Sequence, residues 1–205
     1  MSKIRCLAIG TIAALLAVAA CSGGKTAAGG GKYMKILNVS YDVSRDFYKE
    51  YNPLFIREFT KKHPETDLHV QQSHGGSSKQ ALSVANGLPA DVVTMNQSSD
   101  IDTLQARGLI RPNWQSRLPD KAVPFTSTTV FLVRKSNPKH IRDWDDLTRP
   151  DVKTVFANPK TSGNGRYAFL GAYGYGLKVN NGDEGKTKDF VAALLKNTPV
   201  FENGG

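Results

Sequence analysis

Short apolar runs alternate with longer amphipathic stretches along most of the chain. The apolar runs predict strands at 35–41, 68–72, 90–95, 152–157 and 198–203. Apolar positions three or four residues apart predict helices at 45–63, 79–87, 98–110, 166–176 and 183–197, with a short helix at 144–147. Pro53 falls inside the first helix and predicts a kink or a restart there. Alternating strands and helices are typical of an α/β fold with a largely parallel sheet.

The stretch from Arg117 to Pro138 interrupts this alternation, because a long β-branched run stands between prolines. Its central part, 124–135, is predicted to be a strand that connects two lobes. The predicted organisation is therefore a first lobe over 33–123, the connecting strand, and a second lobe over 136–205.

The N-terminus has the pattern of a secretory leader. Lys3 and Arg5 precede the apolar run "CLAIGTIAALLAVAA", which is shorter than the roughly 20 residues of a membrane-spanning helix and so disfavours a retained anchor. "VAAC" is similar to a bacterial lipobox, which predicts a signal peptide over 1–20, lipid on Cys21 and a flexible Gly-rich tether over 21–32. Cys6 leaves with the leader, so the mature chain has no partner for a disulfide. The prediction is an extracytoplasmic, membrane-anchored lipoprotein.

The chain is basic, with 27 Lys and Arg against 18 Asp and Glu and a net charge of +9. This charge suits an anionic ligand or an anionic membrane surface. Nucleic acid is not an expected partner, because the sequence has neither a basic run interleaved with aromatics nor a nucleic-acid motif. The four histidines lack the spacing of metal ligands, so we expect no metal site and no cofactor.

Polar, glycine-containing junctions join several strands to the helices that follow. They are "YDVSRD" at 41–46, "SHGGSSKQ" at 73–80 and "NPKTSGNG" at 158–165. A helix N-terminus has unpaired N–H groups and the positive end of the helix dipole, so such a junction favours an anion. Ordinary N-capping would leave the same sequence pattern, and that alternative stays open. The junctions match no P-loop, dinucleotide or nucleophile-elbow pattern, so we do not expect an enzyme.

Four segments carry a resemblance to a known family. "LNVSYDVSRDFY", "QQSHGGSSKQ", "PFTSTTVFLVRKSNPK" with "WDDL", and "NPKTSGNGRY" resemble the bacterial sulfate-binding proteins that serve sulfate and thiosulfate ABC importers. The resemblance implies a two-lobed periplasmic binding protein of type II, with the ligand in a cleft between the lobes. It also implies a monomer that delivers its ligand to ABC permease subunits and their ATPase. A tryptophan and further segments that follow in the family have no counterpart before Gly205, so the second lobe is expected to be incomplete.

The resemblance also implies a set of ligand-binding residues. The donors it assigns are the hydroxyl of Ser77 and the backbone N–H groups of Asp42, Ser162, Gly163, Asn164 and Gly205. Asn164 stands where the family has a glycine. The side chain of Asp42 is expected to cap the local backbone or to pair with an arginine such as Arg45 or Arg166.

A site made of donors alone has a clear chemical preference. Sulfate near neutral pH has no proton and only accepts hydrogen bonds, whereas phosphate usually retains a proton that needs an acceptor. The sequence therefore predicts a sulfate or thiosulfate receptor. The alternative is a truncated, non-transporting lipoprotein of the same ancestry with weak or no anion binding.

Overall fold

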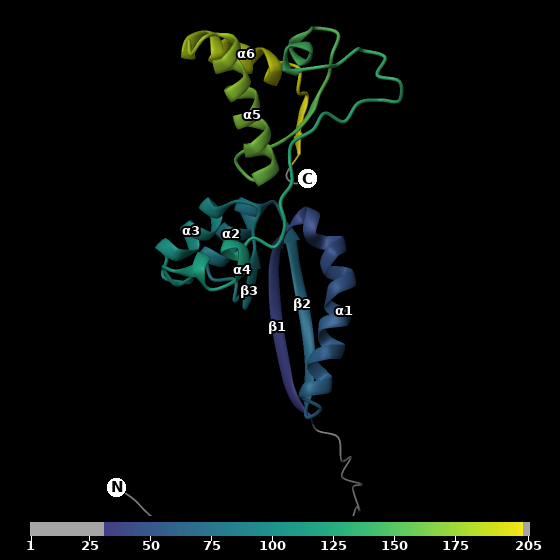
Figure 1. The fold of residues 1–205 in the computed structure, drawn as a ribbon, viewed down its shortest axis with the longest axis vertical. Helices are drawn as coiled ribbons and strands as arrows, with labels where there is room; N and C mark the ends of the chain where they lie inside the picture. The colour runs from purple at the N-terminus through teal and green to yellow at the C-terminus, as the bar shows by residue number, and fades with distance from the viewer. Residues whose placement is uncertain (1–30, 203–205) are drawn as a thin grey trace, which may run out of the picture. The chain divides into compact units, whose positions relative to one another are not determined.

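A computed structural model describes residues 31–202, and its first sheet has three parallel strands in the order β2-β1-β3 (Figure 1). The strands are β1 (Lys32–Tyr41), β2 (Thr66–Gly75) and β3 (Val92–Thr94). The pairing of β1 with β2 runs from Lys32 opposite Thr66 to Tyr41 opposite Gly75. The parallel α/β prediction is confirmed in this part of the chain, although β1 and β2 are longer than their apolar runs indicated.

Three helices accompany this sheet: α1 (Arg45–Lys62), α2 (Ser77–Ala85) and α3 (Ser98–Ala106), with a short 3-10 turn, η1 (Asp42–Ser44), before α1. Helix α1 contains Pro53 and does not restart there. Val39, Val84 and Leu104 form the buried core where β1, α2 and α3 meet.

A second pair of parallel strands, β4 (Val155–Ala157) and β5 (Val200–Glu202), follows later in the chain. Between them lie α5 (Gly163–Val179) and α6 (Glu184–Lys196), and the turn η3 (Trp144–Thr148) precedes them. Their common core contains Phe156, Ala172, Val191 and Leu194. A Cβ at Gly176 would lie 2.9 Å from Thr187 Cγ2, so the close contact of α5 with α6 depends on this glycine.

The prediction of a connecting strand at 124–135 is wrong, because this segment has no strand in the structure. It follows the 3-10 turn η2 (Trp114–Ser116) and α4 (Pro119–Ala122), whose backbone is left-handed at Asp120 and Lys121. The β-branched composition favours an extended chain, but a strand forms only where a neighbour completes its hydrogen bonds. The side chain of Leu132 is 98% exposed, which agrees with a segment that has no pairing partner within residues 31–202.

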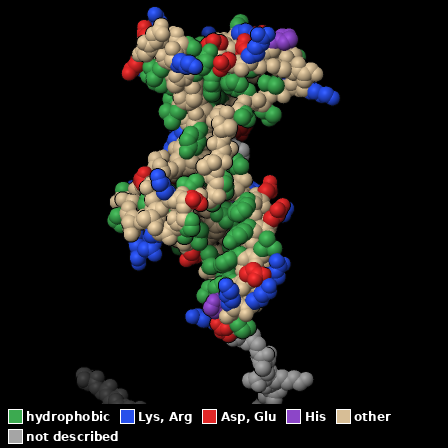
Figure 2. All heavy atoms as spheres, in the orientation of Figure 1, with side chains coloured by type: hydrophobic (Ala, Val, Ile, Leu, Met, Phe, Trp, Pro, Cys, Tyr) green, Lys and Arg blue, Asp and Glu red, His purple; other side chains and the backbone are tan. Residues whose placement is uncertain are grey.

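Hydrophobic side chains gather over α1 in the space-filling view (Figure 2). Phe47 and Tyr51 are about half exposed and stack with ring centroids 5.4 Å apart. Within residues 31–202, no helix combines the length and the apolar character that crossing a membrane requires.

Candidate anion-binding site

The polar junctions lie at the carboxyl ends of parallel strands. β1 is followed by η1 at Asp42, β2 is followed by α2 at Ser77, and β4 is followed by α5 at Gly163. In open α/β sheets, ligands bind beyond the carboxyl ends of strands and beside helix N-termini. The fold therefore gives each predicted junction a position suited to anion binding.

The carboxylate of Asp42 is paired with an arginine and is not expected to contact an anion. The carboxylate forms an ion pair with Arg45, one of the two arginines proposed for it from the sequence. The N–H of Asp42 follows the last pair of the β1–β2 ladder, Tyr41 opposite Gly75, so it lies at the paired edge of β2. The geometry thus neutralises the side chain of this residue with Arg45.

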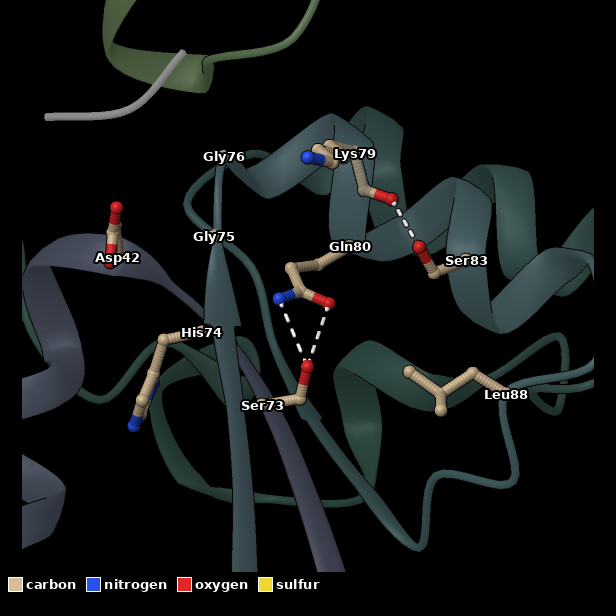
Figure 3. A pocket seen from close by; sticks show the side chains of 9 residues that line it. All are labelled: Asp42, Ser73, His74, Gly75, Gly76, Lys79, Gln80, Ser83 and Leu88. Carbon is tan, nitrogen blue, oxygen red and sulfur yellow. Dashed lines mark hydrogen bonds between the residues drawn. The ribbon is translucent and has the colours of Figure 1, made fainter.

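An open pocket of about 460 Å³ lies beside Asp42 (Figure 3). Its walls are Asp42, Ser73, His74, Gly75, Gly76, Lys79, Gln80, Ser83 and Leu88. Two hydrogen bonds between Ser73 and Gln80, of 3.3 and 3.2 Å, join β2 to α2 across the junction. Gly75 and Gly76 lie between these two residues and add no side chain to the pocket wall.

His74 orients this junction. Its Nδ1 lies 2.7 Å from Ser40 Oγ on the neighbouring strand, and its Nε2 contacts Gln72. Partial burial lowers the pKa of His74, the charge of Arg45 lowers it further, and Asp42 opposes both effects. Because the pKa lies below the ordinary value of 6.5, the imidazole is neutral at pH 7 and adds no charge to the site.

Ser77 is buried, and its hydroxyl already has two partners. Its Oγ donates to Asp100 Oδ2 over 2.7 Å and accepts from the N–H of Asn96 over 3.1 Å. A hydroxyl has one proton, so in this arrangement the Ser77 side chain has none left for an anion. The backbone N–H groups of Ser77, Ser78 and Lys79 donate to no acceptor in residues 31–202, and they form the donor set of this helix N-terminus.

At the junction before α5, some hydrogen-bond donors are also used within the protein, and others are not. The Ser162 N–H donates to Asn158 O over 2.8 Å, and Ser162 Oγ caps the helix by accepting from the N–H of Gly165 over 3.2 Å. The N–H groups of Gly163 and Asn164 have no acceptor in the described part of the chain. Of the three residues predicted here, Gly163 and Asn164 therefore present backbone donors, and Ser162 holds the loop.

Contacts bring the α5 junction next to the turn that follows β3. Asn96 Nδ2 donates to Asn164 Oδ1 over 3.1 Å, and Gln97 Nε2 donates to Gly163 O over 2.9 Å. Since the Asn96 N–H also reaches Ser77 Oγ, the N-termini of α2 and α5 converge on one short turn. Gly205 and Cys21, the remaining predicted residues, lie outside the residues that the structure describes.

Comparisons with known proteins identify the family of this chain. Residues 43–204 match the family model described as bacterial extracellular solute-binding protein. The chain belongs to this family.

Several individual proteins are similar to this chain. The thiosulfate-binding protein of Pseudomonas aeruginosa is 55% identical over 94% of the chain, and the sulfate-binding protein of Salmonella typhimurium is 50% identical over 84% of it. The chain spans 57% and 52% of the length of these two relatives. The solved structure of the sulfate-binding protein SubI from Mycobacterium tuberculosis aligns with a TM-score of 0.70 and 30% identity, covering 84% of this chain and 58% of that one. The predicted periplasmic binding protein fold is confirmed by this match.

Sequence reasoning missed a buried ion pair in this solute-binding protein. Arg166 Nη1 lies 3.1 Å from Asp100 Oδ1 and 3.0 Å from Gln97 Oε1, and its Nε donates to Pro159 O over 3.2 Å. Asp100, at 3% exposure, therefore connects Ser77 at the start of α2 to Arg166 in the first turn of α5. No motif signals this pair, because its members are 66 residues apart.

Both carboxylates near the site are paired with arginines, and the pocket wall also contains the cation of Lys79. Asp42 is paired with Arg45, and Asp100 is paired with Arg166. The unpartnered N–H groups of the helix N-termini carry partial positive charge, which favours an anion without a full counter-charge. Within residues 31–202, no group of His, Cys, Asp or Glu side chains is arranged to hold a metal ion.

Proposed function

We propose that this protein is an extracytoplasmic receptor that binds sulfate or thiosulfate and delivers it to an ABC importer. The observation that carries the proposal is the set of backbone N–H groups without acceptors at the starts of α2 and α5. The printed names of its relatives, which are sulfate- and thiosulfate-binding proteins, support the choice of ligand. They favour a transport receptor over the non-transporting alternative.

Donors without acceptors give the proposed site its selectivity. A fully deprotonated tetrahedral dianion accepts hydrogen bonds at every oxygen, so each backbone N–H finds a partner. A protonated oxyanion brings a donor that these N–H groups cannot receive, which costs about 1 to 3 kcal/mol for each unmatched group in a desolvated site. The carboxylates of Asp42 and Asp100 are ion-paired with Arg45 and Arg166, which weakens both as acceptors for a protonated oxyanion.

Isothermal titration of the chain with sulfate, thiosulfate, selenate and phosphate tests this proposal. We expect sulfate and selenate to bind at least about 10-fold more tightly than phosphate, because 1.4 kcal/mol corresponds to a factor of ten. Neutral His74 adds no charge, so sulfate affinity should change little between about pH 7 and about pH 8. Phosphate binding as tight as sulfate binding would remove the basis of the assignment.

Membrane attachment through Cys21 is the second part of the proposal. It is supported by the lipobox-like "VAAC" and by the glycine-rich residues that follow. Replacing Cys21 by serine should abolish incorporation of labelled lipid and should release the processed protein from the membrane fraction. A Ser22→Ala variant, next to the anchor position, serves as the control and should remain lipidated. Lipid labelling that persists in the Cys21→Ser variant would contradict the anchor.

A further inference from the structure

Asn96 is a residue of this chain that contacts the starts of both α2 and α5. Its backbone N–H donates to Ser77 Oγ over 3.1 Å. Its side-chain Nδ2 donates to Asn164 Oδ1 over 3.1 Å, and its carbonyl accepts from the Tyr167 hydroxyl over 3.1 Å. Asn96 lies two residues after the end of β3 at Thr94, so the first sheet restricts its position.

The amide of Asn96 packs closely against Gly163. A Cβ added to Gly163 would lie 1.7 Å from Asn96 Oδ1, so a side chain at 163 could not coexist with this position of the amide. Asn96 Oδ1 is buried and has no hydrogen-bond partner within the described residues. Because an unpaired buried oxygen costs free energy, the other contacts of Asn96 must hold the side chain in place.

We propose that Asn96 and Asn164 form an amide clamp that determines how long a bound oxyanion stays in the site. The inference rests on the proposed function, since it names two residues that position that site's donors. Asn164 contributes its N–H as one of these donors, and its side chain pairs with Asn96, so loss of the pair loosens the donor itself. The pair also gives a reason for asparagine at 164, where the resemblance led us to expect glycine.

The clamp is separable from the contacts that maintain the fold. Gln97 donates to Gly163 O over 2.9 Å and Arg166 pairs with Asp100 over 3.1 Å, and neither contact uses the side chain of Asn96 or Asn164. These bonds keep α5 beside the turn after β3. The amide pair therefore affects the rate at which the site opens rather than the formation of the elements around it.

Stopped-flow kinetics with sulfate test the clamp in three variants of the full chain: Asn96→Ala, Asn164→Gly and the double variant. Each single variant should raise the dissociation rate constant about 5- to 10-fold and change the association rate constant less than about twofold, as expected for the loss of one hydrogen bond. The double variant should dissociate no faster than about twice either single variant, because both remove the same contact. Asn113→Ala is the control, since Asn113 is exposed and far from this contact in the sequence. Additive effects of the single variants, or unchanged dissociation, would overturn the clamp.

Hydrogen exchange of the ligand-free chain separates failure of the clamp from failure of the proposed function. Residues 163–167 should exchange faster in both single variants than in the unmodified chain and in Asn113→Ala. The unmodified chain could fail to bind sulfate while this difference in exchange is present. That result would support the clamp and contradict the assignment of sulfate as the ligand. Unchanged exchange at 163–167 in both variants contradicts the clamp whether or not sulfate binds.

Discussion

Replacement of Gly165 by alanine is expected to lower the free energy of unfolding by about 3 kcal/mol, near the upper end of what overpacking usually costs. A Cβ at this position would lie 2.4 Å from Ala157 O and 2.8 Å from the carbonyl carbons of Ala157 and Asn158. All three atoms belong to the backbone, so no side-chain rotation relieves the clash. The variant must move either the start of α5 or the end of β4.

Thermal unfolding measures this effect. For a domain of this size, 3 kcal/mol corresponds to a decrease in Tm of about 6 to 12 °C. Gly174→Ala is the matched control, because Gly174 lies in the same helix and an added Cβ there meets nothing within 4 Å. The control should be as stable as the unmodified chain or more stable by up to about 1 kcal/mol, since alanine favours helix. Equal Tm values for Gly165→Ala and the unmodified chain would contradict the packing at this junction.

Replacement of Asp100 by alanine should cost about 3 kcal/mol of stability and weaken sulfate binding as well. The change removes the acceptor of Ser77 Oγ and the carboxylate that pairs with Arg166. Breaking a buried ion pair from one side costs about 3 to 5 kcal/mol, and the lower value applies because the Arg166 side chain remains 31% exposed. Without this carboxylate, no side chain within residues 31–202 joins Ser77 to Arg166, so the starts of α2 and α5 are held less firmly.

Chemical denaturation with paired sulfate titrations tests the role of Asp100. Asp102→Ala is the control on the same helix: its carboxylate is exposed and accepts one hydrogen bond of 3.3 Å from Trp114, so the cost should stay below about 1 kcal/mol. The double variant Asp100→Ala, Arg166→Ala should be less destabilised than the sum of the two single variants. Additive effects would mean that the pair contributes nothing as a unit.

The sequence predicted the elements whose evidence is local. The apolar runs of β1 and β2 and the amphipathic pattern of α1 are properties of neighbouring residues, and the structure has each element close to its predicted position. The polar junctions before α2 and α5 were also predicted, because glycine, serine and asparagine mark the start of a helix in the sequence itself.

Features that depend on distant residues could not be predicted in this way. Segment 124–135 has the composition of a strand, but composition does not supply a pairing neighbour. The proton of Ser77 goes to Asp100, which is 23 residues later, and Arg166 reaches Asp100 from a further 66 residues along the chain. The sequence therefore located the donors, whereas the structure identified which of them are already engaged.

In the proposed site, backbone N–H groups at the starts of α2 and α5 bind the anion. An amide ¹H–¹⁵N titration of the chain with sulfate tests it most directly, because each donor reports separately. We expect saturable downfield proton shifts at Ser77, Gly163 and Asn164, with little change at Ser162, whose N–H already donates to Asn158. Shifts confined to exposed lysines, or unsaturable shifts spread over the surface, would contradict the claim.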